Sequence, residues 1–243
     1  MRWPLVRGVI ALSLACIGAA AFADGYEPAR AAPVAAPIWT GAYANAGLGY
    51  GFWDATTTTD APGRCVSCAK TDHAGKGWLG EVGVGYDYQF NNRFLAGVLF
   101  NYDFADIRGR VSDAVFTTAD TSSDSTWFIG ARAGWLITPD ILNYVSVGYT
   151  KTRFSGGALH NSYTGAQLPD ARLQGYDAGG WFVGGGLEVA MHNGWFWRNE
   201  VRYADYSNGV RIESGISPEF QLQFDPIVGT ATTGVVYKLD WPH

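Results

Sequence analysis

Apolar and polar residues alternate along most of the chain after residue 39, and residues 80–90 show the pattern most clearly. The even positions of this segment carry only Val, Tyr or Phe after Gly80, whereas its odd positions carry glycine, Glu81, Asp87 and Gln89. A period of two is that of a β-strand whose two faces meet different surroundings. The question is therefore whether the bulky face contacts protein, water or lipid.

The same alternation recurs along the chain and predicts eight strands. They cover residues 40–53, 80–90, 93–104, 125–137, 141–154, 180–191, 195–203 and 227–239. Tight turns of turn-forming residues and long polar segments connect them in alternation. The turns lie at residues 91–92, 139–140 and 192–194, and the polar segments at 54–76, 105–124, 155–177 and 208–225. This arrangement is typical of an outer-membrane barrel.

A soluble barrel of lipocalin type would also show alternation, but two features favour the membrane. The Trp residues after residue 23 lie near the ends of predicted strands, where aromatic girdles meet the membrane interfaces. They are at positions 39, 53, 78, 127, 135, 181, 195, 197 and 241. The face opposite the bulky residues carries glycine in nearly every strand, which suits a narrow interior. We therefore predict an all-β fold, an eight-stranded antiparallel transmembrane β-barrel with short periplasmic turns, long extracellular loops and its bulky face toward lipid.

The N-terminal residues have the features of a secretory signal peptide. Arg2 and Arg7 precede an apolar run at 9–17, and Ala21-Phe-Ala23 forms a cleavage pattern. We predict a signal peptide over 1–23, a Pro/Ala-rich periplasmic leader over 24–38 and the barrel over 39–243. Cleavage removes two of the 17 basic residues and none of the 22 acidic ones, so the net charge changes from −5 to −7. An acidic chain argues against nucleic acid as a partner.

Charged residues occur on the predicted inner face. Eight strands enclose a lumen that the barrel's own side chains can fill. Opposite charges in so narrow a space favour pairing, because an unpaired charge there is costly. We predict a lumen charge network that plugs the barrel, with a conducting pore as the alternative. Its predicted members are Glu81, Arg132, Glu188, Arg198, Glu200, Arg202 and Lys238.

Two cysteines, Cys65 and Cys68, lie in the first long polar segment. A disulfide between them is favoured in an oxidising compartment. A metal site that also uses Asp72 and His73 is the weaker alternative, because a single CxxC has no second pair of ligands. An enzyme would need a nucleophile, a base and an acid at the lipid-facing rim. No recognisable motif supplies them, so we assign no catalytic residue, cofactor or metal.

Three segments resemble a known family. Residues 37–43, PIWTGAY, resemble the WTGFYVG opening of the Gram-negative outer-membrane immunogenic protein family, small porin-like barrels of the OmpA and opacity-protein superfamily. Residues 180–188, GWFVGGGLE, and 200–206, EVRYADY, resemble its GWTVGAGVEY and LEYRYVDYG segments. The resemblance covers residues 33–240. It implies a surface antigen of the outer membrane of a Gram-negative bacterium, with a structural role in envelope integrity and in displaying loops.

The resemblance also implies partners and alternative functions. Outer-membrane lipids and lipopolysaccharide are expected to surround the barrel, with no nucleic acid bound and no particular oligomeric state indicated. The alternatives are a surface ligand-binding protein or adhesin, as for haem in some relatives, or a weak small-solute pore. The C-terminal pattern of Thr232, Gly234, Tyr237 and Leu239 is similar to the β-signal that the barrel-assembly machinery reads. The family usually ends on Phe, whereas this chain continues through residues 240–243, which predicts altered recognition by that machinery.

Overall fold

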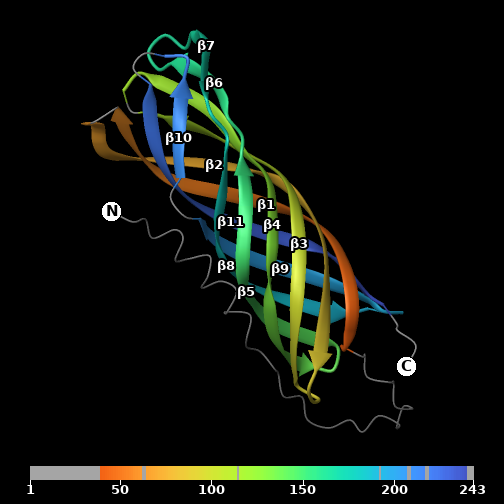
Figure 1. Ribbon diagram of the computed structural model, residues 1–243. Helices are drawn as coiled ribbons and strands as arrows, with labels where there is room; N and C mark the ends of the chain where they lie inside the picture. The colour runs from red at the N-terminus through yellow and green to blue at the C-terminus, as the bar shows by residue number, and fades with distance from the viewer. Residues whose placement is uncertain are drawn as a thin grey trace, which may run out of the picture.

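The computed structural model describes residues 39–61, 64–113, 115–191, 193–206, 209–216 and 219–239, with 61 and 64–69 described as backbone only. Among these residues, no helix is long and apolar enough to cross a membrane. The described chain is built almost wholly from strands (Figure 1). They are β1 (Gly41–Ala61), β2 (Arg64–Gln89), β3 (Phe94–Ser112), β4 (Thr117–Thr138), β5 (Ile141–Phe154), β6 (Gly157–Asn161), β7 (Gln167–Leu173), β8 (Tyr176–Ala190), β9 (Trp195–Tyr206), β10 (Gly209–Ser214) and β11 (Phe220–Lys238).

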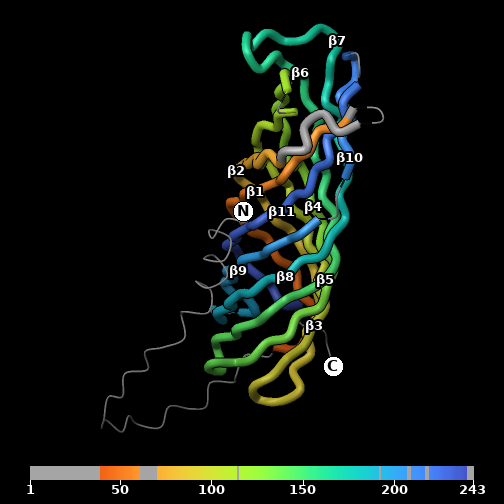
Figure 2. The backbone as a smooth tube through the Cα atoms, turned by 90° about the vertical axis from the view of Figure 1, so that its left-hand side faces the viewer, coloured from red at the N-terminus to blue at the C-terminus, as the bar shows by residue number. Residues whose placement is uncertain are grey.

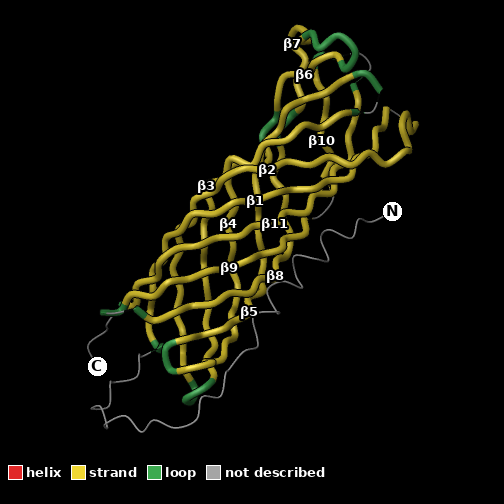
Figure 3. Tube along the Cα trace, turned by 180° about the vertical axis from the view of Figure 1, so that it is seen from behind, coloured by secondary structure: helices red, strands yellow, loops and turns green. Residues whose placement is uncertain are grey.

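Eight of these strands form a closed antiparallel ring. Its order is β1-β2-β3-β4-β5-β8-β9-β11, and β11 pairs back onto β1 from Tyr43 opposite Lys238 to Asp60 opposite Gln221. The strands wind obliquely around the barrel, as closure of a sheet requires (Figure 3). Short turns join β2 to β3, β4 to β5 and β8 to β9 at one end. The predicted eight-stranded antiparallel barrel is confirmed.

The four long polar segments, predicted as loops, are largely strands instead. β1 continues to Ala61 and β2 begins at Arg64, while β3 and β4 occupy most of 105–124. β6 and β7 lie within 155–177, and β10 lies within 208–225. Beyond the membrane ring, β4 pairs with β6, β6 with β7, β7 with β10 and β10 with β11. The barrel wall therefore continues outward, with β6, β7 and β10 taking the places of β5, β8 and β9 (Figure 2). We call this part, together with the outer ends of β1–β4 and β11, the extracellular extension.

The reversal of the apolar face along β11 explains why these segments are strands. Near the membrane end, Val235 and Tyr237 are exposed while Lys238 is buried. In the extension the pattern inverts, because Leu222 and Phe224 are buried while the glutamines that alternate with them are exposed. Lipid draws apolar side chains outward, whereas water drives them inward. The loop prediction was wrong because it treated polar outer residues as a sign of irregular structure.

Arg211 of β10 joins the two parts of the wall. Its side chain is buried, and its guanidinium donates to the backbone oxygens of Ser155 at 2.6 Å and Gln174 at 3.1 Å. These residues lie at the breaks between β5 and β6 and between β7 and β8, where the ladder changes partner. A third donor reaches Thr121 at 3.0 Å, and the ring of Phe224 lies 5.2 Å from the charge. Arg211 thus gives the Gln174 carbonyl a donor at one strand break, and at the other it shares the Ser155 carbonyl with the hydroxyl of Thr121.

Two tryptophans predicted for the membrane girdles point inward instead. Trp39 and Trp53 are fully buried, whereas Trp78 and Trp181 are 72% and 50% exposed. The Trp53 indole donates to the backbone oxygen of Ile107 at 3.0 Å. Glycines make room for it, since a Cβ on residue 75 or 109 would lie 2.2 or 2.4 Å from the indole. The girdle prediction is therefore wrong for both: Trp53 occupies an inward position of β1 where neighbouring strands carry glycine, and Trp39, just before β1, packs inward against Phe196.

Candidate functional site: the lumen charge network

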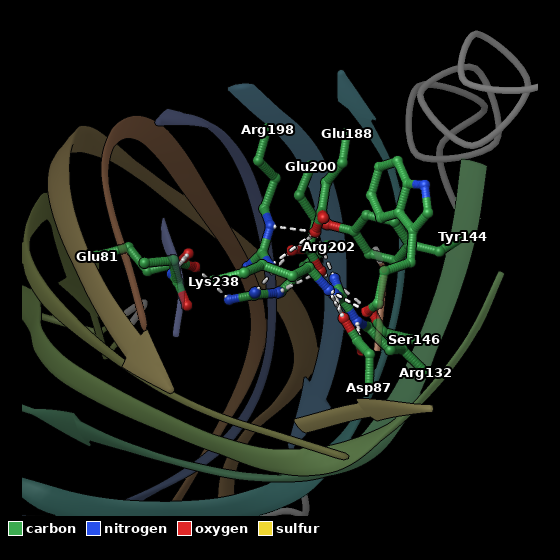
Figure 4. Close-up of polar contacts among 12 residues, drawn as sticks. Glu81, Asp87, Arg132, Tyr144, Ser146, Glu188, Arg198, Glu200, Arg202 and Lys238 are labelled. Carbon is green, nitrogen blue, oxygen red and sulfur yellow. Dashed lines mark hydrogen bonds and ion pairs between the residues drawn. The ribbon is translucent and has the colours of Figure 1, made fainter. Parts of the chain in front are cut away.

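Nine charged side chains are buried inside the membrane-spanning ring, and Figure 4 shows most of them converging on one region. The seven predicted members all occupy inward positions. Asp87 and Asp103 are absent from the predicted network, although the alternation of their strands places both inward. The nine residues, which we call the lumen charge network, are Glu81, Asp87, Asp103, Arg132, Glu188, Arg198, Glu200, Arg202 and Lys238.

Arg132 of β4 lies at the periplasmic end of the network. Its Nε donates to Asp87 Oδ1 at 2.8 Å, one Nη donates to the other oxygen of Asp87, and the second Nη donates to Glu188. The guanidinium also lies 4.6 Å from the ring centre of Tyr43 and 4.9 Å from that of Tyr144. A planar guanidinium suits this position, since it can bind a carboxylate through two bonds while it stacks on aromatic rings.

Arg198 and Lys238 complete this end of the network. Arg198 Nε donates to Glu188 Oε1 at 2.8 Å, so Glu188 accepts from two arginines. Lys238 Nζ donates to Asp87 and, at 2.6 Å, to the backbone oxygen of Trp39. Arg198 and Glu188 are thus paired on the neighbouring strands β9 and β8, whereas Lys238 links β11 to β2 past the intervening strand β1.

Arg202 of β9 lies at the other end. It donates to both oxygens of Glu200 at 2.8 Å and to Glu81 through its remaining Nη. Glu200 also accepts from Tyr144 at 2.8 Å and from Ser146 at 3.1 Å. These contacts satisfy charges that would be costly if they were buried alone.

Apolar clusters lie on both sides of the lumen charge network. The periplasmic cluster consists of Trp39, Tyr43, Leu95, Leu142, Tyr144, Phe196 and Val236. The larger cluster fills the extracellular extension and includes Trp53, Ile107, Phe154, Leu159, Leu222 and Phe224. Side chains therefore occupy the interior from the periplasmic end through the extension. The extension's apolar interior was missed at the sequence level for the reason given above for β11.

The extension also contains a buried carboxyl group, that of Glu213 on β10. Thr117 donates to its Oε1 at 2.8 Å. Burial raises the pKa of Glu213 from 4.5 to about 7; the hydrogen bond from Thr117 opposes this rise and the charge of Asp113 adds to it. Asp113 itself accepts hydrogen bonds from three backbone amides in the β3–β4 turn, at 2.8–2.9 Å.

The raised pKa of Glu213 predicts that the extension loses stability as the pH rises. Between pH 4.5 and about 7, the folded extension binds this proton while the unfolded chain releases it. Its stability is therefore highest below pH 4.5 and falls by about 2–3 kcal/mol as the pH passes through 7. We expect amide hydrogen exchange in β10, corrected for its intrinsic pH dependence, to accelerate from pH 5 to pH 8.

Two substitutions distinguish the titration of Glu213 from the titration of exposed carboxylates as the cause of this pH dependence. Glu213→Gln should flatten the pH dependence, because it removes the titrating group. Glu219→Gln, at an exposed position of the same segment, should leave it unchanged. If Glu213→Gln left the pH dependence of exchange in β10 unaltered, a titrating group other than Glu213 would have to cause that dependence.

Several predicted features fall outside what the structure describes. The side chains of Cys65 and Cys68 belong to residues 61–69, so the disulfide stays a prediction, as do the signal peptide, the leader and residues 240–243. Among the described residues, no group of three or more His, Cys, Asp or Glu could hold a metal ion. His73 instead contacts Thr57 at 2.9 Å.

The predicted β-signal residues lie on both faces of the last strand. Tyr237 and Leu239 are 37% and 44% exposed on the outer face. Thr232 and Gly234 alternate with them and so point to the lumen side. Recognition by the barrel-assembly machinery stays a prediction.

Comparison with known proteins identifies the family. The family model described as outer membrane protein beta-barrel domain matches residues 9–238. The chain is 27% identical over 220 residues to the 31 kDa outer-membrane immunogenic proteins of Brucella melitensis biotype 1 and Brucella suis biovar 1, covering 82% of this chain and 87% of each relative. The crystal structure of the outer membrane protein OprG from Pseudomonas aeruginosa superposes with a TM-score of 0.55 at 13% identity, over 83% of this chain and 97% of that one. The protein is accordingly located in the outer membrane of a Gram-negative bacterium. With its closed ring of eight antiparallel strands, the chain belongs to the family of outer-membrane β-barrel proteins.

Proposed function

We propose that this protein is a structural barrel of the outer membrane with a plugged lumen, which supports the envelope and displays its extracellular extension. The observation that carries this proposal is the filling of the interior by side chains, with the lumen charge network between two apolar clusters. An eight-stranded barrel is just wide enough for such filling. The proposed role involves no catalysis.

The extension supports the display part of the proposal. Its core holds it as a continuation of the barrel wall, so the β6–β7 hairpin is presented at the end of the wall opposite the short turns (Figure 2). The tip of this hairpin carries Tyr163, which is 83% exposed. A rigid platform of this kind suits recognition from outside the cell, since binding to a preorganised surface has a smaller ordering cost.

Planar bilayers test the plug directly. We expect the purified wild-type barrel to show no steady conductance, because ions would have to displace paired charges and two apolar clusters. A conducting porin inserted by the same protocol provides the control for insertion. A steady wild-type current whose ion selectivity changes in Arg202→Gln would place the current in the lumen and contradict the proposal.

A further inference from the structure

Asp103 of β3 is the member of the lumen charge network for which the described chain shows no ion pair. The network contains five acidic and four basic side chains, so it carries one excess negative charge when all are ionised. Asp103 lies directly opposite Glu81 on the neighbouring strand. Two like charges in adjacent inward positions destabilise a sheet unless something lies between them.

The basic groups near Asp103 are already bound by other carboxylates. Arg202 donates through Nε and both Nη atoms to Glu200 and Glu81. On the other side of Asp103, Thr126 donates its hydroxyl to Thr152 at 2.7 Å. Within the described chain, Asp103 Oδ1 is buried without a hydrogen-bond partner.

Two amide side chains lie in the next inward row to Asp103 and Glu81. Asn45 and Asn101 flank Gly83 on the neighbouring strands, and a Cβ on Gly83 would lie 2.7 Å from the Oδ1 of Asn45 and 2.6 Å from that of Asn101. Asn101 is fully buried, and neither of these Oδ1 atoms has a hydrogen-bond partner among the described residues. The missing side chain at Gly83 leaves the space that both oxygens face. Asn45 and Glu81 also line a small pocket together with Arg198 and residues of β1 and β11.

We propose that Asp103, Asn101 and Asn45 bind a single alkali cation, such as Na⁺, inside the lumen. All three candidate ligand atoms are oxygens, which is the ligand type of hard cations. One positive charge balances the one excess negative charge of the network, whereas a divalent ion would leave an unbalanced charge in a poorly solvated interior. The cation would separate Asp103 from Glu81 and give partners to three buried oxygens, which is more than a proton on Asp103 could satisfy.

Unfolding in different salts tests the proposal. The full-length barrel, refolded in detergent micelles, is unfolded by urea in NaCl, KCl or choline chloride at one ionic strength, so that screening is constant. The fraction folded is followed by the gel mobility of unheated samples. At an Na⁺ concentration of about ten times the dissociation constant, the ratio of folded to unfolded protein should rise about tenfold over that in choline.

Two variants make the result specific. Asp103→Asn keeps the shape of the side chain and removes the excess charge, so it should fold and lose the difference between Na⁺ and choline. Asp177→Asn should retain it, because Asp177 is half exposed in an ion pair with Lys151. The proposal is overturned if wild type and Asp103→Asn respond equally to Na⁺. It is also overturned if Na⁺ and choline act alike while acidification alone stabilises the wild type, because the occupant would then be a proton.

Discussion

The Arg132→Met barrel should lose about 3–5 kcal/mol of unfolding free energy, the largest loss we expect from a single lumen substitution. Methionine keeps much of the volume but leaves Asp87 without its bidentate partner and Glu188 without one of its two arginines. The cost arises mainly from these carboxylates, whose side chains are fully buried. Lost stacking on Tyr43 and Tyr144 adds to it.

Arg110→Met is the matched control for this experiment. Arg110 also pairs with an aspartate, Asp120, but both side chains are about 70% exposed in the extension. An exposed pair of this kind contributes about 0–1 kcal/mol. Urea titrations of both variants, read from the mobility of the folded band, should therefore separate them clearly. Equal losses would mean that the lumen pairs are as well solvated as the surface.

The membrane ring could be predicted from the sequence because lipid imposes a strict rule on each strand. Outward positions between the girdles are mostly apolar, so the alternation reports both the strand and its facing. The positions of Glu81, Arg132 and the other predicted charges followed from that rule. Their partners did not, because pairing depends on register between strands that are distant in the chain, as for Arg202 and Glu81.

The strands of the extension could not be predicted from the sequence, for two physical reasons. Outside the membrane, the apolar face turns inward, so the same alternation has the opposite meaning there. In β4, moreover, an irregularity between Ser123 and Ser125 changes which positions point inward. Buried residues are odd-numbered from Thr117 to Ser123 and even-numbered from Thr126 to Arg132. A pattern of period two does not reveal the position of such a shift.

Trp53→Ala tests whether the extension has a core of its own, and it should cost about 3–5 kcal/mol. The indole is fully buried and its ring centre lies 5.9 Å from that of Phe224 and 6.3 Å from that of Phe154. Alanine would leave a cavity between glycines that have no side chains to fill it, and the backbone oxygen of Ile107 would lose its indole donor. Faster hydrogen exchange in β6, β7 and β10 should accompany the loss.

Trp78→Ala provides the comparison, because Trp78 is 72% exposed on the outer face of β2, the strand next to that of Trp53. Removing an exposed indole creates no cavity, so we expect a loss well below that of Trp53→Ala and little change in the exchange of the extension. If both variants lost the same stability, the inward placement of Trp53 would be wrong and the girdle assignment would regain support. Alternatively, only Trp53→Ala loosens β6, β7 and β10 while the membrane ring keeps its protection from exchange. The extension then has a separately stabilised core, which is held together by aromatic rings buried away from water and not by contact with lipid.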